Sequence, residues 1–175
     1  MDLAALVRNV PDFPKPGIQF KDITPLLMNS QAFREIIDGW RERYADKRLD
    51  AIVGAEARGF VFGAPLAYAM GWPFVLIRTK GKLPADTFSV AFELEYGPAS
   101  FEIHTDARNP GDRVVLVDDL LATGGTMAGM VKLVQQLKAE IVELAFVIEL
   151  GFLDGRAQLK GVPIHTLIQY NSEDS

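Results

Sequence analysis

The 175-residue chain contains no cysteine, so disulfide bonds, thiolate catalysis and zinc–thiolate sites are excluded. No stretch approaches the roughly 18 consecutive apolar residues that a membrane-spanning helix needs. Residues 1–20 contain no apolar run long enough for a signal peptide. We therefore expect a cytoplasmic protein that has no membrane partner.

The chain also lacks an excess of basic residues. It has 18 Lys and Arg but 23 Asp and Glu, which gives a net charge of −5. Nucleic-acid-binding proteins normally have a basic excess or a basic stripe, so no nucleic-acid partner is expected. A phosphate ligand is still compatible with this charge, since backbone N–H groups and a few local cations can hold one. Neither a Walker P-loop nor a G-x-G-x-x-G motif is present.

Short apolar segments alternate with helical patterns along the chain, without a repeat or a linker, which predicts a single domain over residues 1–175. Helices are predicted over residues 1–10, 30–48 (with Ser30 as N-cap), 59–70 and 125–138. Strands are predicted over residues 50–54, 74–77, 91–96, 100–104, 113–117, 141–150 and 163–168. This alternation predicts an α/β fold with an open, mostly parallel, twisted sheet flanked by helices.

The most informative segment begins as the buried strand 113–117 and continues into two carboxylates, a loop with two glycines and a helix. Ligands of open α/β sheets bind beyond the carboxyl ends of the strands, where this loop must lie. Its N–H groups can converge on a phosphate at the helix N-terminus, where the helix dipole also favours an anion. The predicted phosphate-binding residues are Ala122, Thr123, Gly124, Gly125 and Thr126.

The carboxylates of Asp118 and Asp119 need a different partner. Ionised carboxylates accept hydrogen bonds strongly, so the 2′- and 3′-hydroxyl groups of a ribose suit them. A simpler alternative is that both residues only cap the following helix. Their position beside a phosphate loop favours a ribose 5-phosphate ligand.

Residues 118–126 resemble the phosphoribosyl pyrophosphate motif of the type I phosphoribosyltransferase family. Five further stretches resemble the adenine branch of this family, so the resemblance covers nearly the whole chain: residues 13–18, 20–23, 56–60, 81–84 and 94–97. The resemblance implies the fold of that family, with residues 1–30 contributing a hood over the base and residues 78–90 forming a flexible lid. It also implies transfer of the phosphoribosyl group from phosphoribosyl pyrophosphate to adenine, which gives AMP and pyrophosphate in purine salvage.

The resemblance assigns the pyrophosphate site to Glu56, Ala57 and Arg58, with a cis peptide bond between Glu56 and Ala57. Taken by itself, Arg58 has a simpler interpretation as one half of a surface salt bridge. The residues of this segment offer N–H groups and a guanidinium, which are the donors that a diphosphate needs.

The segment 78–89 is basic, contains Gly81 and Pro84, and is too polar for a core. These properties predict a mobile lid that excludes water from the reaction. The resemblance assigns Arg78 and Lys82 to pyrophosphate. Thr79 stands where some relatives carry a second basic residue, which reduces the charge that the lid supplies.

The resemblance places the general acid or base at Glu95, which would exchange a proton with adenine N7 while N9 attacks C1 of the ribose. Glu93 and Glu102 are rivals by position, and strand alternation puts Glu93 on the same face as Glu95. For adenine, Phe20 is expected to stack on the ring, the backbone at Lys21 to read its edge, and Leu120 to close the other side. From the residues alone, a phenylalanine such as Phe20 is more often an ordinary core residue.

Magnesium is expected to enter bound to phosphoribosyl pyrophosphate, because it prefers substrate phosphates and water, and no dedicated protein metal site is predicted. His104 and His165 are isolated and are interpreted as structural. The resemblance further implies a homodimer. Two other functions stay open: a regulatory protein that senses phosphoribosyl pyrophosphate without turnover, and the same transfer to hypoxanthine, xanthine or orotate.

Overall fold

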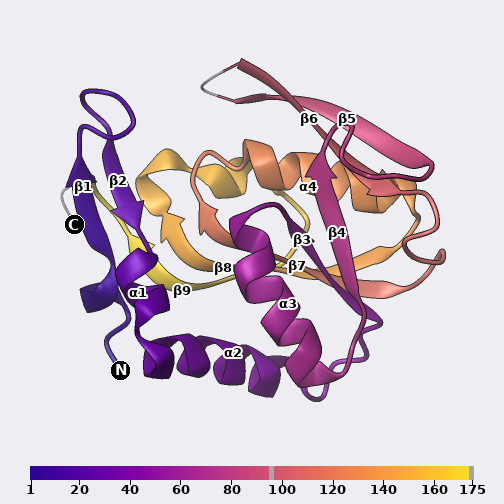
Figure 1. Ribbon diagram of the computed structural model, residues 1–175, viewed down its shortest axis with the longest axis horizontal. Helices are drawn as coiled ribbons and strands as arrows, with labels where there is room; N and C mark the ends of the chain where they lie inside the picture. Colours follow the sequence, from indigo (N-terminus) through magenta and orange to yellow (C-terminus); the bar gives the residue numbers. More distant parts are fainter. Residues whose placement is uncertain (95–96, 174–175) are drawn as a thin grey trace.

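The computed structural model describes residues 1–94 and 97–173, and within them the main feature is a seven-stranded sheet with the order β5-β6-β4-β3-β7-β8-β9 (Figure 1). Its strands are β3 (Ala51–Ala55), β4 (Phe74–Thr79), β5 (Thr87–Leu94), β6 (Gly97–His104), β7 (Arg113–Leu121), β8 (Glu140–Leu150) and β9 (Ile164–Tyr170). The five neighbouring strands β4, β3, β7, β8 and β9 run parallel to one another. The antiparallel hairpin β5–β6 pairs with β4 through β6, and this pairing is also antiparallel. The predicted open, mostly parallel sheet is therefore confirmed.

Helices cover both faces of this sheet (Figure 1). The helices are α1 (Thr24–Met28), α2 (Ser30–Tyr44), α3 (Arg58–Met70) and α4 (Gly125–Gln136), with shorter 3₁₀ turns η1 (Ala4–Leu6), η2 (Gly151–Leu153) and η3 (Gly155–Gln158). Side chains of β7 alternate between two cores: Val115 and Val117 pack with α2 and α3, whereas Val114 and Leu116 pack with α4. Alternation on a strand buried on both faces explains the wholly apolar sequence of this segment.

The N-terminal segment differs from its prediction. The expected helix over residues 1–10 is wrong, since only η1 is helical and residues 8–11 form β1 (Arg8–Pro11), which pairs antiparallel with β2 (Gln19–Asp22). The apolar side chains that suggested a helix, Leu3, Leu6 and Val7, still pack against the core on the α2 side. Burial of these residues therefore does not require helical spacing, and the pairing with β2 decides the backbone.

Several element boundaries also differ from the predicted ones; for example, β4 ends at Thr79 rather than at residue 77, and β5 begins at Thr87 rather than at residue 91. Asn29, not Ser30, caps α2, because its side-chain oxygen accepts hydrogen bonds from the N–H groups of Gln31 and Ala32 at 3.1 and 3.0 Å. Strand β7 continues past the predicted end to Leu121, so that Asp118 and Asp119 belong to the strand. In the described part of the chain, no helix is long and apolar enough to cross a membrane.

Candidate active site

The carboxyl ends of β3, β4 and β7 lie side by side at one end of the sheet, because β3 is the parallel neighbour of both other strands. A cavity of about 140 Å³ lies at this end, lined by Arg58 and by residues 119–127. This is the position at which open α/β sheets bind their ligands. The cavity therefore brings together Asp119 of the predicted ribose pair, the predicted phosphate residues and Arg58 of the predicted pyrophosphate residues, whereas Asp118 does not line it.

A wider surface hollow of about 530 Å³ lies between the N-terminal segment and α1. The charged side chain that lines it is Arg8, which already donates to Asp22 at 3.0 and 2.7 Å. Convergent polar groups mark a ligand site better than volume does. We therefore take the smaller cavity at the strand ends as the candidate site.

The loop after β7 leads directly into α4. Gly124 has a φ of +87°, which a residue with a side chain rarely adopts, and it stands at the N-cap of α4 without a side-chain cap. An α-helix leaves its first N–H groups without intrahelical partners, so those at the start of α4 face the cavity region lined by residues 119–127. This geometry is that of an anion site.

The two acidic residues differ in their surroundings. Asp119 is 6% exposed and accepts a short hydrogen bond from Nε of Arg58, while its own N–H donates to the Asp118 carboxylate at 2.9 Å. Burial raises the pKa of Asp118 well above its usual value of 3.8, and the negative charge of Asp119 raises it further. Asp118 therefore takes up a proton more readily than an ordinary aspartate.

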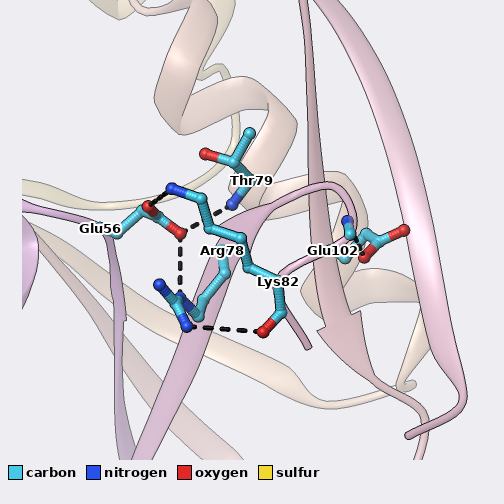
Figure 2. Close-up of polar contacts among 6 residues, drawn as sticks. Glu56, Arg78, Thr79, Lys82 and Glu102 are labelled. Carbon is cyan, nitrogen blue, oxygen red and sulfur yellow. Dashed lines mark hydrogen bonds and ion pairs between the residues drawn. The ribbon is translucent and has the colours of Figure 1, made fainter. Parts of the chain in front are cut away.

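Glu56 forms ion pairs with Arg78 and Lys82 at the end of β4 (Figure 2). Its carboxylate accepts hydrogen bonds from Nε of Arg78 at 3.0 Å, from Nζ of Lys82 at 2.6 Å and from the N–H of Thr79 at 2.9 Å. Burial alone would raise the pKa of Glu56, but the hydrogen bonds from Lys82, Thr79 and Arg78 lower it overall. The expected cis peptide bond between Glu56 and Ala57 is present.

The segment that begins the expected lid is anchored at several points. Figure 2 shows Glu102 on β6, whose carboxylate accepts from the N–H of Gly81 at 3.0 Å. The N–H of Lys80 donates to the carbonyl of Ser100 at 3.0 Å, and Ala85 donates to Nε2 of His104 at 3.3 Å. Of the expected lid over residues 78–90, only residues 80–86 lie outside the strands. His104 thus has a structural contact.

The hairpin β1–β2 carries two of the predicted adenine residues, Phe20 and Lys21, and β7 carries the third, Leu120. Phe20 is half-buried and packs edge-on against Phe13, with ring centroids 5.1 Å apart. Lys21 is buried, and its ammonium donates to Asn9 at 2.8 Å and lies 4.0 Å from the ring centroid of Tyr170. Successive strand residues face opposite sides, so the two side chains do not share a pocket. Leu120 is half-buried and packs against the core on the α2 side.

The chain matches the family model of the phosphoribosyl transferase domain over residues 23–164. It is also 56% identical over 169 residues to the adenine phosphoribosyltransferase of Chloroflexus aurantiacus, with 97% of this chain and 98% of that one covered. The chain belongs to the adenine phosphoribosyltransferase family.

Solved structures of this family have the same fold. The adenine phosphoribosyltransferase of Thermoanaerobacter pseudethanolicus has a TM-score of 0.92 and 50% identity, over 97% of this chain and 98% of that one. The enzyme of Saccharomyces cerevisiae, complexed with an imino-altritol bisphosphate and adenine, has a TM-score of 0.90 and 42% identity, over 95% and 96% of the two chains. The adenine phosphoribosyltransferase fold thus extends along nearly the whole chain.

Glu95, to which the family resemblance assigns the proton transfer, lies outside the described residues. Its rival Glu93 is exposed near the end of β5, and the carbonyl oxygen of Glu93 is 3.5 Å from where a Cβ on Gly125 would lie. The end of β5 therefore reaches the start of α4. The second rival, Glu102, is 7% exposed and bonded to the lid backbone, so its carboxylate is engaged away from the cavity at residues 119–127.

Proposed function

We propose that this protein transfers the 5-phosphoribosyl group from phosphoribosyl pyrophosphate to adenine, which gives AMP and pyrophosphate. The observation that carries the proposal is the acidic pair Asp118–Asp119 beside Arg58, directly before the uncapped N-terminus of α4. Neighbouring groups of opposite charge suit a ligand that carries hydroxyl groups between two phosphate groups. Membership of the adenine phosphoribosyltransferase family supports adenine as the base.

In this mechanism, the backbone of residues 122–126 holds the 5′-phosphate at the start of α4. The carboxylates of Asp118 and Asp119 accept hydrogen bonds from the ribose hydroxyl groups and so fix the position of C1. The two acids act on neutral hydroxyl groups, which explains why a carboxyl with a raised pKa is tolerated here. With the phosphate and the ribose both fixed, C1 is the atom at which the bond to pyrophosphate breaks and the bond to adenine forms.

The leaving pyrophosphate needs positive charge, which Arg58, Arg78 and Lys82 supply together with the backbone at Glu56 and Ala57. Glu56 holds Arg78 and Lys82 together at the end of β4 before the ligand arrives. Magnesium would enter as the complex with the substrate diphosphate and neutralise part of its charge. Oxygen ligands suit this ion, so the carboxylates of Asp118 and Asp119 would accept hydrogen bonds from its waters.

Adenine would stack on Phe20, with Leu120 on its other side and the backbone at Lys21 reading its edge. The lysine side chain itself is engaged by Asn9 and Tyr170, which supports a role for the backbone of this residue alone. Glu95 would exchange a proton with N7 as N9 attacks C1 and the bond to pyrophosphate breaks.

We also propose a homodimer that works in the cytoplasm. Val61 and Tyr68 lie two turns apart on α3, and they are 36% and 89% exposed. Exposed apolar side chains on one face of a helix support a surface that a second copy covers. The absence of cysteine is compatible with a reducing compartment.

The test is an assay of pyrophosphate release from phosphoribosyl pyrophosphate with magnesium and each of adenine, hypoxanthine, xanthine and orotate. We expect release with adenine at a rate at least about a hundredfold above that with the other bases, since a site that reads polar edge groups rejects mismatches strongly. Release with another base alone would correct the substrate. No release with any base would favour a protein that senses phosphoribosyl pyrophosphate without turnover.

A further inference from the structure

The phosphate loop rests on a second loop that the mechanism above does not use. Residues 151–158, which form η2 and η3 after β8, bring Gly155 directly against the backbone of the phosphate loop. A Cβ on Gly155 would clash with the carbonyl oxygen of Ala122, and a Cβ on Gly124 would clash with the carbonyl oxygen of Gly155. The two backbones therefore touch with no side chain between them, and the position of one determines that of the other.

An ion pair between the buried carboxylate of Glu149 and the half-exposed side chain of Arg156 holds this second loop in place. Arg156 donates two hydrogen bonds to the carboxylate of Glu149, from Nε at 2.6 Å and from Nη2 at 2.7 Å. The hydroxyl of Thr166 on β9 donates to the same carboxylate at 3.1 Å. The side chain of Glu149 is only 4% exposed, and hydrogen bonding by Arg156 lowers its pKa although burial opposes this.

The ion pair connects the two segments that border the phosphate loop. Glu149 is the register partner of Leu121 in the pairing of β7 with β8, and Leu121 immediately precedes Ala122. On the other side, Arg156 immediately follows Gly155. The carboxylate at the end of β8 thus fixes the loop that contacts the phosphate loop, while its own strand fixes the residue at which the phosphate loop begins.

An ion pair with a buried carboxylate is a costly way to stabilise a fold, because removing Glu149 from water cancels much of its attraction to Arg156. Its value lies in orientation, since a bidentate arginine–carboxylate pair fixes both distance and angle. We propose that Glu149 and Arg156 are positioning residues for the 5′-phosphate: they hold Gly155 against Ala122 and Gly124, so that the N–H groups of the phosphate loop converge. This inference rests on the proposed function, in which residues 122–126 bind the 5′-phosphate.

The test compares the affinities for AMP and adenosine, which differ only in the 5′-phosphate. We expect Glu149→Gln and Arg156→Gln to weaken AMP binding by about tenfold or more while adenosine affinity stays within about twofold. The KM for phosphoribosyl pyrophosphate should rise with that for adenine nearly unchanged. Arg156→Lys keeps the charge but loses the bidentate geometry, so it should restore part of the AMP affinity.

Gly155→Ala tests the backbone contact without touching a charge, and it should reproduce the selective loss of AMP affinity. Gly39→Ala is its control, because nothing lies within 4 Å of a Cβ at Gly39. Equal losses for AMP and adenosine, or no loss in folded variants, would overturn the inference. Wild-type protein that binds AMP no more tightly than adenosine would instead overturn the phosphate site itself, and with it the proposed function.

Discussion

Arg58 at the start of α3 donates a hydrogen bond to Asp119 in β7, and this contact joins two groups that the proposed mechanism assigns to different parts of one substrate. The side chain of Arg58 is 53% exposed, whereas that of Asp119 is 8% exposed. The guanidinium therefore has free surface toward solvent while the carboxylate does not. A diphosphate can approach Arg58 from the solvent side without first breaking its bond to Asp119.

Replacement of Arg58 by Gln should affect both the pyrophosphate and the acidic pair. Hydrogen bonds to charged groups contribute about 1.5–3 kcal/mol each, so kcat/KM for phosphoribosyl pyrophosphate should fall roughly a hundredfold. Steady-state kinetics measure this loss. Arg41→Gln is the matched control, because Arg41 is half-exposed on α2 and pairs only loosely with Asp38, at 3.7 Å. An equal effect in both variants would contradict a specific role.

Asp118→Asn should stabilise the folded protein at neutral pH while weakening phosphoribosyl pyrophosphate binding about tenfold. Burial and the charge of Asp119 raise the pKa of Asp118, so its ionised form destabilises the fold, and protonation removes this penalty as the pH falls. The increase in Tm over wild type should therefore be largest at neutral pH and shrink toward acid pH. Thermal unfolding across the pH range measures this, and a Tm difference independent of pH would contradict it.

Glu56→Ala should loosen the start of the lid. Because Arg78, Lys82 and the N–H of Thr79 lose their shared acceptor, the amide of Thr79 and those of residues 80–83, 85 and 86 should exchange with deuterium about tenfold faster. Hydrogen-exchange mass spectrometry of the ligand-free protein makes the measurement. Asp38→Ala, which removes an exposed carboxylate on α2, should leave exchange in the lid unchanged.

Glu95→Gln should lower kcat by about a hundredfold, which is a usual contribution of general acid–base catalysis, with AMP affinity changed less than about threefold. Glu93→Gln and Glu102→Gln serve as comparisons. If Glu93→Gln shows the larger loss of kcat, the proton transfer belongs to Glu93. Full activity of the Glu95 variant would remove that residue from the mechanism.

Glu143→Gln should destabilise the fold by about 3 kcal/mol at pH 7 without altering the site. Arg43 donates to the Glu143 carboxylate at 2.8 and 2.7 Å, and the hydroxyl of Tyr44 donates at 2.6 Å. Burial would raise the pKa of Glu143, but these bonds lower it from 4.5 to about 2. The lowered pKa means that the stabilisation is complete above pH 4.5 and is lost as the pH falls toward 2.

Urea unfolding of wild type and the Glu143 variant between pH 7 and pH 3 tests this dependence, because the difference should narrow below pH 4.5. Glu140→Gln is the control, since Glu140 forms an exposed pair with Arg113 and should change stability by less than about 1 kcal/mol.

Local patterns predicted the parts of this molecule that local physics determines. The apolar, mostly β-branched run 114–117 and the glycines at 124 and 125 predicted a buried strand, a tight turn and a helix start, because each depends on residues within a few positions. The acidic pair could be located for the same reason. That Asp118 and Asp119 lie within β7 could not be seen, since this depends on pairing with β8.

The contacts that escaped prediction are non-local. Pairing of residues 8–11 with residues 19–22 overrode the helical spacing of the N-terminal segment. Nothing in the sequence near Glu149 indicates that its carboxylate binds Arg156, because a loop brings the two together only after β8 is complete. The cis peptide bond at Glu56 was expected only from the family resemblance, since no residue type in that segment predicts it.

The contact between Lys21 and Tyr170 has a consequence for the order in which the chain folds during synthesis. Tyr170 ends β9, whereas Lys21 belongs to β2, which is synthesised much earlier. The β1–β2 hairpin therefore lacks one of its packing partners until β9 has been synthesised. A chain stalled before residue 164 would carry this hairpin without its C-terminal support, leaving the ammonium of Lys21 without the ring that shields it.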